Sequence, residues 1–428
     1  MMIADYALTI CIQIKGGKEM GLEKEVVEML DMLSNIGNDP TGGMTRLLYS
    51  DSWKQAQEYV QKKLETSGMA TRFDSVGNLF GRIEGSKYPN ETILSGSHID
   101  TVVNGGTLDG QYGVVAAVLA IDYLKKTYGA PLRSLEVISM AEEEGSRFPT
   151  VFWGSKNFVC EAKREDVETI SDFEGHSFVT EMRRQGFDFR DPNESIREDI
   201  KAFVEIHIEQ GSVLEKENLQ IGVVNNIAGQ KRYTFVLKGQ ANHAGTTPMG
   251  YRQDAVYGFA KICSTVIDRG LELGDPLVVT FGKVEPKPNT VNVVPGEVLF
   301  TMDCRHTDSH LLDSFTAEAE QLIQEIAAEH DLTVEMDLWM NERPVPMDEE
   351  IVATVERAVK NSGKRYKVMH SGAGHDSQII APHFPTAMIF VPSIDGISHN
   401  PAEATPTDDL IAGVEVLAAA LYELAYKE

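Results

Sequence analysis

A regular alternation of short apolar runs with helical stretches constrains the fold of this chain most. The apolar runs of strand length lie at residues 78–83, 91–95, 134–140 and 203–208. Between the second and third runs, Tyr112 to Lys126 have the length and apolar content of a buried helix. An amphipathic helix is predicted before the first of these runs, because apolar side chains recur at helical spacing from Trp53 to Leu64. Gly68 predicts where this helix ends. Strands that alternate with helices indicate an α/β sheet domain covered on both faces.

Residues 232–339 follow a different order, β-α-β-β-α-β. The strands predicted in this segment lie at 232–238, 277–284, 297–304 and 332–339, and the helices at 251–269 and 311–330. This order is typical of a small ferredoxin-like domain with one sheet and two helices. The α/β pattern then resumes with helices at 348–361 and 408–426. We therefore predict a main domain at 20–225 and 340–428, with 226–339 inserted into it as a lid that closes over a cleft.

The first nineteen residues do not match a secretory signal, because no basic region is followed by an apolar core and a cleavage site. A helix-like pattern begins only after Met20. We therefore predict that residues 1–19 are a non-structural extension and that Met20 is the true start. In this hypothesis Lys15-Gly-Gly-Lys-Glu is a translated ribosome-binding sequence. An intact residue 1 in the mass spectrum of the native protein would contradict it.

Length and composition limit the kind of protein. A length of 428 residues suggests two or three domains, and with 42% hydrophobic residues the chain can bury a large core. The net charge of −26 disfavours binding to nucleic acids and to anionic membrane surfaces. The best apolar run, Val114 to Leu124, is shorter than a membrane span and contains Asp122. The four cysteines form no CxxC pair, which argues against a disulfide scaffold and a cysteine zinc site and favours a reducing, cytoplasmic location.

Two motifs around the second apolar run carry candidate metal ligands. In LSGSHIDTV (94–102), His98 and Asp100 share one face of a strand, and a metal-bound imidazole usually donates its other N–H to a carboxylate. In NGGTLDGQYG (104–113), Asp109 directly precedes the apolar helix, where an N-cap residue belongs. The same position also suits a carboxylate that bridges two cations. Neither motif decides between these interpretations alone.

The third motif, LEVISMAEEEGSRF (135–148), places Glu142, Glu143 and Glu144 at the end of an apolar strand. Three neighbouring carboxylates repel one another unless they are solvated or neutralised by cations. A solvated acidic turn is one interpretation. In the other, one carboxylate binds a metal ion and its neighbour accepts a proton from the attacking water.

Two further motifs add histidines, which also occur as ordinary core and loop residues. FVEIHIEQG (203–211) has His207 and Glu209 on a strand, and DGISHNPAE (395–403) has His399 in a loop. Four of the five motifs end or follow an apolar strand, at the edge where open α/β sheets bind ligands. Imidazoles and carboxylates without a thiolate suit Zn²⁺, Mn²⁺, Co²⁺ or Ni²⁺ better than Ca²⁺ or Mg²⁺.

Together these motifs resemble the dinuclear metal-dependent aminoacylase and carboxypeptidase superfamily, and within it the amidases that hydrolyse carbamoyl groups. The resemblance extends over nearly the whole chain after Met20, and it is carried by HIDTV, NGGTLDG, EEEGSRF, HIEQG, NHAGTTPM, VNVVPG, SGAGHD and SHNPAE. It implies a mixed-sheet, metallopeptidase-like catalytic domain with two divalent metal ions. It also implies that the inserted ferredoxin-like domain serves as a lid and joins two chains into a homodimer.

The family pattern maps onto this sequence residue by residue. The metal ligands that the resemblance implies are His98, Asp109 and His207 for one ion, and Asp109, Glu144 and His399 for the other. Glu143 matches the general base, Asp100 the partner of His98, and His243 a residue that stabilises the transition state. The implied substrate contacts are Gln210, His243, Asn292, Arg305, Gly372 and Ala373.

Three of these residues also have structural interpretations that the sequence leaves open. Asn292 suits the turn before Pro295, and His243 suits an ordinary loop. Arg305 lies close in sequence to Asp303 and Asp308, either of which is a natural ion-pair partner.

The implied reaction is the hydrolysis of a carbamoyl (ureido) C–N bond in a small anionic substrate. The favoured substrate is allantoate, which would give ureidoglycine, ammonia and CO₂ in purine-nitrogen salvage. N-carbamoyl-L-amino acids are the alternative substrate, ahead of the peptides and acyl amides of the wider superfamily. A non-catalytic protein that binds a small acid is the second alternative. Because two nitrogens donate into a ureido carbonyl, catalysis needs both a polarised carbonyl and a strong nucleophile.

Overall fold

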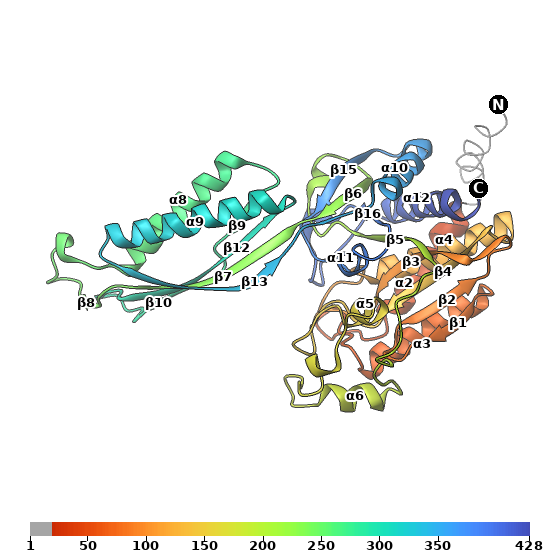
Figure 1. Ribbon diagram of the computed structural model, residues 1–428, viewed down its shortest axis with the longest axis horizontal. Coiled ribbons are helices and arrows are strands. Elements are labelled where there is room, and N and C mark those ends of the chain that lie inside the picture. Colours follow the sequence, from red (N-terminus) through yellow and green to blue (C-terminus); the bar gives the residue numbers. More distant parts are fainter. Residues whose placement is uncertain (1–18) are drawn as a thin grey trace. The chain divides into compact units, whose positions relative to one another are not determined.

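The computed structural model describes residues 19–428, with side chains from Gly21 onward (Figure 1). The extension and start site predicted around Met20 therefore lie outside the described side chains. The described chain divides into two compact units. Unit 1 runs to Asn225 and resumes at Met347, and unit 2 comprises Asn226–Pro346.

A mixed sheet of nine strands forms the centre of unit 1. The strands of this sheet are β1 (Ala70–Phe73), β2 (Leu79–Ile83), β3 (Tyr88–His98), β4 (Arg133–Met140), β5 (Ile200–Ile208), β6 (Ile221–Ile227), β14 (Val345–Pro346), β15 (Tyr366–Ser371) and β16 (Thr386–Val391). Their order is β1-β2-β4-β3-β5-β16-β6-β14, with β15 paired to β6. The middle strands β4, β3, β5 and β16 are parallel, whereas β2 and β6 are antiparallel to their neighbours β4 and β16.

Helices cover both faces of this sheet, as the sequence predicted. The helices of unit 1 are α2 (Glu19–Ser34), α3 (Asp51–Thr66), α4 (Gln111–Tyr128), α5 (Trp153–Phe158), α6 (Phe178–Arg184), α7 (Val213–Lys216), α10 (Glu349–Ser362), α11 (Asp376–Ile380) and α12 (Thr407–Ala425). Successive strand residues point to opposite faces. Ile93 and Val137 therefore join the larger core, while Leu94 and Ile138 join a second core with side chains such as Phe158 and Ile380.

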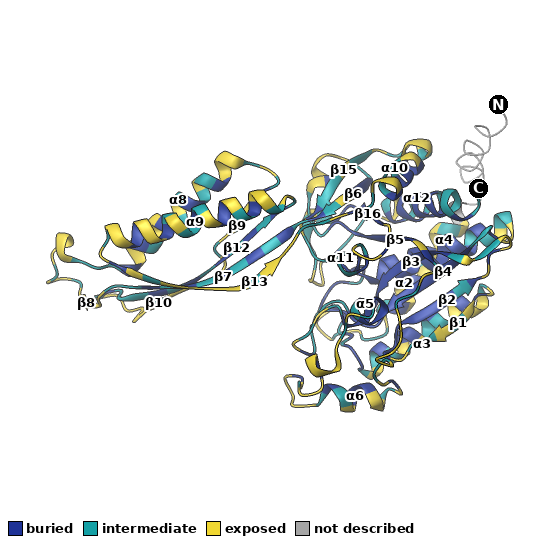
Figure 2. Ribbon diagram, viewed as in Figure 1, coloured by how far each residue is buried: buried dark blue, intermediate teal, exposed yellow. Residues whose placement is uncertain are grey.

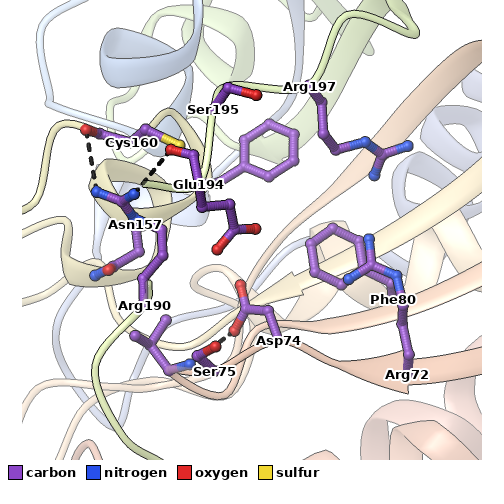
Figure 3. Close-up of a pocket in the computed structure, with 12 residues that line it drawn as sticks. Arg72, Asp74, Ser75, Phe80, Asn157, Cys160, Arg190, Glu194, Ser195 and Arg197 are labelled. Carbon is purple, nitrogen blue, oxygen red and sulfur yellow. Dashed lines mark hydrogen bonds between the residues drawn. The ribbon is translucent and has the colours of Figure 1, made fainter. Parts of the chain in front are cut away.

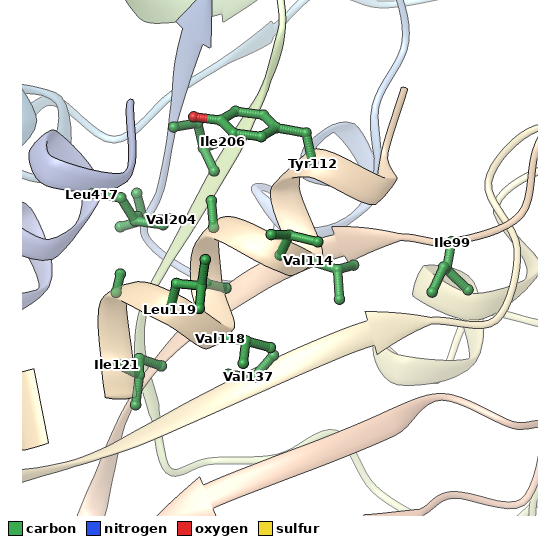
Figure 4. Close-up of a cluster of buried hydrophobic side chains, with 14 of the residues drawn as sticks. Ile99, Tyr112, Val114, Val118, Leu119, Ile121, Val137, Val204, Ile206 and Leu417 are labelled. Atoms are coloured by element: carbon green, nitrogen blue, oxygen red, sulfur yellow. The ribbon is translucent and has the colours of Figure 1, made fainter. Parts of the chain in front are cut away.

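Helix α4 is buried almost all round, which explains its apolar sequence. Val114 and Val118 lie over the sheet near Val137 and Val204, and Leu417 of α12 lies beside them (Figure 4). The dark blue of α4 in Figure 2 shows the same burial. The helix begins after Gly110, whose φ of 60° is in the left-handed region, and a Cβ there would collide with the ring of His98.

Unit 2 is an antiparallel sheet with two long helices. Its strands are β7 (Gly229–Lys238), β8 (Asn242–His243), β9 (Val278–Thr280), β10 (Val284–Lys287), β11 (Val293–Val294), β12 (Glu297–His306) and β13 (Thr333–Glu342), and its helices are α8 (Ala255–Leu273) and α9 (Ser309–Glu329). The sheet order is β10-β12-β7-β13, with β9 on β12, while β8 and β11 form a separate pair. Together with the mixed sheet of unit 1, this confirms the predicted fold class.

Two predicted elements of unit 2 were wrong in detail. The strand predicted over 277–284 is two short strands, β9 and β10. Helix α8 begins at Ala255 rather than 251, because the Asp254 side chain accepts the N–H groups of Val256 and Tyr257 and so caps the helix. Over the described residues, the helices do not reach the combination of length and apolarity that a membrane span requires.

Candidate metal centre

The parallel strands of unit 1 bring four of the sequence motifs to one edge of the sheet. β4, β3, β5 and β16 are neighbours in that order, and their carboxyl ends lie at the same edge. His98 is the last residue of β3, His207 lies next to the end of β5, and Glu143 and Glu144 follow β4. His399 is in the loop that follows β16. This is the convergence that the motif positions predicted.

One group of ligand atoms consists of His98, Asp109 and His207. One atom from each lies within 4.8 Å of the others. Asp109 Oδ1 is 3.2 Å from His207 Nε2 and 3.5 Å from His98 Nε2. All three residues are buried, so a divalent cation is a natural partner for their lone pairs.

A second group shares Asp109 with Glu144 and His399. His399 Nε2 lies 3.3 Å from the other Asp109 oxygen, Oδ2, and 3.5 Å from Glu144 Oε2. Asp109 thus directs one oxygen to each group. Its interpretation as the N-cap of α4 is wrong, because Gly110 occupies that position and the helix has no side-chain cap.

The electrostatics of Asp109 follow from these histidines. Burial raises the pKa of a carboxyl group, but His207, His399 and His98 outweigh burial and hold the pKa of Asp109 well below its ordinary value. An ionised carboxylate with one oxygen on each side is the arrangement that two nearby cations require.

Both buried imidazoles present Nε2 to the centre. His207 Nδ1 lies 2.9 Å from the carbonyl oxygen of Ile208. His98 Nδ1 lies 3.1 Å from the carbonyl oxygen of Asp100 and 3.3 Å from its carboxylate. An acceptor at Nδ1 fixes the ring proton there and leaves the lone pair on Nε2, the atom that would bind a metal ion. In His207 this lone pair accepts the backbone N–H of Gly110 at 3.0 Å. The expected pairing of His98 with Asp100 is thus present mainly through the backbone.

The Asp100 carboxylate also fixes the acidic segment after β4. It accepts the backbone N–H of Glu143 at 3.0 Å and that of Glu144 at 3.1 Å. Glu142 is turned away, where it accepts the N–H of Trp153 at 2.9 Å and that of Gly145. The three glutamates are therefore not a solvated acidic turn.

Glu143 and Glu144 differ in what surrounds them. Burial raises the pKa of Glu144 to about 8, with a further contribution from Asp109. Burial raises the pKa of Glu143 well above its ordinary value, although His98 opposes it. Glu143 belongs to neither ligand group, so its carboxyl group is available to hold a proton.

Ser398 and Glu403, which the sequence analysis did not single out, form hydrogen bonds around Asp109. Ser398 Oγ lies 2.8 Å from Asp109 Oδ2 and 3.0 Å from Glu403, and the two carboxylates share its one O–H donor. Glu403 accepts the backbone N–H groups of Leu108 and Asp109 at 2.8 and 3.0 Å. Both residues belong to the SHNPAE motif. Their closeness in sequence to His399 could have indicated that they lie near the metal centre.

Three predicted substrate contacts, Gln210, Gly372 and Ala373, lie within the same unit. Gln210 Nε2 donates to Asp109 Oδ2 at 2.7 Å. Ala373 exchanges hydrogen bonds with Ser371 Oγ through its N–H and its carbonyl. His375, to which the sequence gave no role, packs its ring 4.6 Å from that of His207. Its neighbour Asp376 is buried, and burial raises its pKa to about 8.

Unit 2 brings His243 and Asn292 together. His243 on β8 pairs with Val293 on β11, and Ala244 N–H donates to the Asn292 carbonyl at 3.0 Å. The N–H of Gly245 donates to His243 Nδ1 at 3.0 Å, so in the neutral ring Nε2 carries the proton. Both His243 and Asn292 are exposed.

Arg305 lies far from that pair within the same unit. Gly239 N–H donates to the Gly296 carbonyl just before β12, on the side of β8 and β11, whereas Arg305 is near the other end of β12. At about 3.3 Å per residue, the eight residues from Glu297 to Arg305 span roughly 26 Å. Arg305 forms a two-pronged pair with Asp303, at 3.1 and 3.0 Å. Asp303 is thus the ion-pair partner that the sequence left open.

Comparison with known proteins agrees with this geometry. Residues 94–423 match the family model Peptidase family M20/M25/M40. The chain belongs to this family. It is 58% identical over 403 residues to allantoate amidohydrolase of Escherichia coli (strain K12), across 94% of this chain and 98% of that protein. It is 43% identical to allantoate amidohydrolase of Bacillus subtilis (strain 168), across 96% and 99%.

A solved structure is similar to this chain over nearly its full length. An amidase of the hydantoinase/carbamoylase family from Burkholderia multivorans superposes with a TM-score of 0.90 at 33% identity, covering 95% of this chain and 98% of that one. This chain is therefore a hydrolase of the hydantoinase/carbamoylase branch, as its motifs indicated.

Proposed function

We propose that this M20-family hydrolase cleaves a carbamoyl C–N bond of allantoate, giving ureidoglycine, ammonia and CO₂. The observation that carries the proposal is the 58% identity to an allantoate amidohydrolase across nearly the full length of both chains. A site with two ligand groups that share one carboxylate suits hydrolysis of an unreactive carbonyl. N-carbamoyl-L-amino acids remain the alternative substrates, and a non-catalytic role in binding a small acid is the second alternative.

The donor set fits two divalent cations. His98, Asp109 and His207 would hold one, and Asp109, Glu144 and His399 the other, with Asp109 between them. Two such cations polarise a carbonyl and lower the pKa of water toward 7. Imidazole and carboxylate ligands favour Mn²⁺ or Zn²⁺, with Co²⁺ or Ni²⁺ as further candidates.

Glu143 is the proposed general base. It takes a proton from the water that attacks the carbamoyl carbon and returns it to the leaving nitrogen as the C–N bond breaks. The carbamate so formed decays to ammonia and CO₂. Asp100 positions Glu143 and Glu144 through their backbone N–H groups. Gln210, Gly372 and Ala373 are proposed to contact the substrate.

His243, Asn292 and Arg305 are proposed to act from unit 2. The Nε2–H of His243 is suited to donate to the oxyanion that develops on the carbonyl, and the Arg305 guanidinium to bind the substrate carboxylate. Because Arg305 is roughly 26 Å along β12 from the end that carries His243 and Asn292, one copy of this unit cannot offer all three to one substrate. We therefore propose a homodimer through unit 2, in which two copies share these roles.

The outer strand β13 of unit 2 supports that assembly. Within the described sheet β13 is an edge strand, and its side chains Met336, Leu338 and Trp339 are exposed. An edge strand with exposed apolar groups is prone to pair with another chain. We also retain the cytoplasmic location as part of the proposal, since Cys160, Cys263 and Cys304 are free thiols among the described cysteines.

A substrate panel and a chelator test this function together. We expect the purified protein to release ammonia from allantoate with a kcat/KM well above that for N-carbamoyl-L-amino acids. Dialysis against a chelator should abolish this release, and Mn²⁺ or Zn²⁺ should restore it. A higher kcat/KM for N-carbamoyl-L-amino acids would establish the alternative substrate. Allantoate that binds without turnover at any metal loading would establish the binding protein.

Replacing Arg305 by Gln is expected to raise the KM for allantoate about ten- to a hundredfold. This corresponds to the roughly 1.5–3 kcal/mol of a hydrogen bond to a charged group. Metal content should not change. Arg232→Gln is the matched control, because Arg232 also pairs with Asp303, at 2.9 Å. If both variants raise KM equally, the effect comes from Asp303 and not from contact with the substrate.

A further inference from the structure

The acidic loop, defined as residues 141–154, runs from the end of β4 into the first turn of α5 and carries Glu143 and Glu144. Asp100 holds the middle of this loop, because its carboxylate accepts the backbone N–H groups of both glutamates. The two ends of the loop meet at a different side chain, Asn78, which is fully buried between β1 and β2. The contacts of this amide therefore affect where the two glutamates lie.

The strand order explains why Asn78 reaches the loop. β2 runs antiparallel to β4, and Leu79 lies opposite Ser139, so Asn78 is level with the end of β4. Asn78 Oδ1 accepts the N–H of Ala141 at 2.8 Å, and Asn78 Nδ2 donates to the carbonyl oxygen of Gly154 at 3.0 Å. One planar amide group thus bonds the first and the last residue of the acidic loop.

The end of the loop approaches Asn78 so closely that only glycine fits. A Cβ at Gly154 would lie 2.7 Å from both the Ala141 nitrogen and Asn78 Oδ1, which is too close without a shift of one of them. Just before Gly154, the N–H of Phe152 donates to the carbonyl oxygen of Glu143 at 3.2 Å. A displacement of this end of the loop would therefore be passed directly to the backbone of Glu143.

The turn before β2 fixes the orientation of the Asn78 amide. Asp74 Oδ1 accepts the backbone N–H groups of Val76, Gly77 and Asn78 at 3.0, 2.9 and 2.9 Å, and Gly77 supplies the positive φ of 102° that the turn requires. Asp74 Oδ2 accepts the second Nδ2 hydrogen of Asn78 at 2.6 Å. Both donors and the acceptor of the amide are thus used. A reversed amide would oppose like groups at all three contacts.

Asp74 is held by this turn rather than by an ion pair. Figure 3 shows its carboxylate at a small pocket of about 50 Å³, which Arg72 and Arg190 also line. Arg72 pairs with Glu136 at 3.6 Å, and Arg190 donates to the backbone carbonyl of Glu194 at 3.2 Å. Both guanidinium groups thus have other partners, and the N–H groups of the turn orient the carboxylate that orients Asn78.

We propose that Asn78 is a positioning residue of the metal centre. By bonding Ala141 and Gly154 at once, it sets the path of the acidic loop, which brings Glu144 to its ligand group and places Glu143 beside it. The part that concerns Glu144 depends on the ligand geometry alone. The part that concerns Glu143 rests on the proposed function, in which this residue is the general base.

Asn78→Ala and Gln57→Ala test the proposal as a matched pair, because each removes a buried amide. Gln57 Nε2 donates to the carbonyl oxygens of Ser139 and Gly77 at 3.3 and 3.5 Å, outside the acidic loop. Both variants should unfold at a lower temperature than the native enzyme. Only Asn78→Ala should bind one metal ion about 10- to 100-fold more weakly, the usual effect of losing a group that positions a ligand.

Calorimetric titration with Mn²⁺ measures these affinities without any substrate. Asn78→Ala should give the pattern of Glu144→Gln, in which one ion is weakened and the ion of His98, Asp109 and His207 is not. Native affinity for both ions in Asn78→Ala, or the same loss in Gln57→Ala, would overturn the proposal. Gly154→Ala is a second variant that displaces the Asn78 amide from the other side, and it should weaken the same ion. If Asn78→Ala does not fold, native affinities in Gly154→Ala would overturn the proposal instead.

Turnover tests the part that concerns Glu143, with whichever carbamoyl compound the native enzyme hydrolyses fastest. At saturating metal, Asn78→Ala should lower kcat about 10- to 100-fold, since a displacement of about 1 Å at a reacting group can cost that much. KM should stay that of the native enzyme, and Gln57→Ala should keep native kcat and KM. A native kcat in Asn78→Ala would refute the positioning of Glu143. A native enzyme that hydrolyses no carbamoyl compound would contradict the proposed function, while the metal titration would still decide the role of Asn78.

Discussion

Glu143→Gln is expected to lower kcat about a thousandfold while the metal content stays that of the native enzyme. Glutamine has nearly the same shape but cannot take a proton from the attacking water. General bases typically contribute about 10²–10⁴-fold, so a thousandfold loss corresponds to roughly 4 kcal/mol. Metal content should not change because Glu143 belongs to neither ligand group. Ammonia release and elemental analysis of the same preparation measure both quantities.

Glu142→Gln is the matched control for this experiment. Glu142 is a buried neighbour with a raised pKa, but its oxygens accept the N–H groups of Trp153 and Gly145. Its replacement should lower thermal stability and leave kcat within about tenfold, because a surviving amide oxygen still accepts one of these bonds. A kcat in Glu143→Gln that is also within tenfold of the native value would remove Glu143 as the base.

Asp109→Asn is expected to abolish both metal binding and turnover. Asp109 directs Oδ1 to the group with His98 and His207, and Oδ2 to the group with His399. Asparagine loses the negative charge and replaces one oxygen with an N–H₂ donor that repels a cation. Both ions should therefore be lost, whereas Glu144→Gln, which alters only one group, should weaken one ion alone. Metal titration monitored by calorimetry distinguishes the two patterns.

Asp122→Asn controls for the loss of a carboxylate from the same region. Asp122 lies on α4, and its partner is Lys126 Nζ at 2.5 Å. Loss of this pair should lower thermal stability and leave metal content unchanged, because Asp122 belongs to neither ligand group. If Asp109→Asn retains two ions with native affinity, Asp109 does not bridge them and the assignment of both groups must be abandoned.

The local pattern of the chain was sufficient to predict much of the fold. The apolar run at 134–140 and the stretch 112–126 are β4 and α4 within two residues at each end. These elements are buried on all sides, so their apolar character is continuous and easily read. The break of residues 277–284 into β9 and β10 was not predictable, because both short strands pair with β12 and their register depends on that partner.

The candidate metal centre was likewise predictable only in part from the sequence. Which residue types can hold cations, and that they follow strands, could be read from His98, His207 and His399 in their motifs. Whether Asp109 caps α4 or faces two ligand groups could not, because both roles occupy the same position before a helix. The support from Ser398 and Glu403 also depends on the loop after β16 reaching Asp109.

The sequence by itself determined the two kinds of sheet, the insertion of one pattern into the other and the set of groups able to bind metal ions. These are properties of short segments, since periodicity, charge and ligand chemistry act over a few residues. Only the tertiary structure decided that Asp109 serves two groups and that Arg305 pairs with Asp303 far from His243. The residues around Asp109 are distant along the chain, and the separation of Arg305 from His243 depends on where their strands lie. Strand order and side-chain direction, which set both, are fixed only when each sheet has formed.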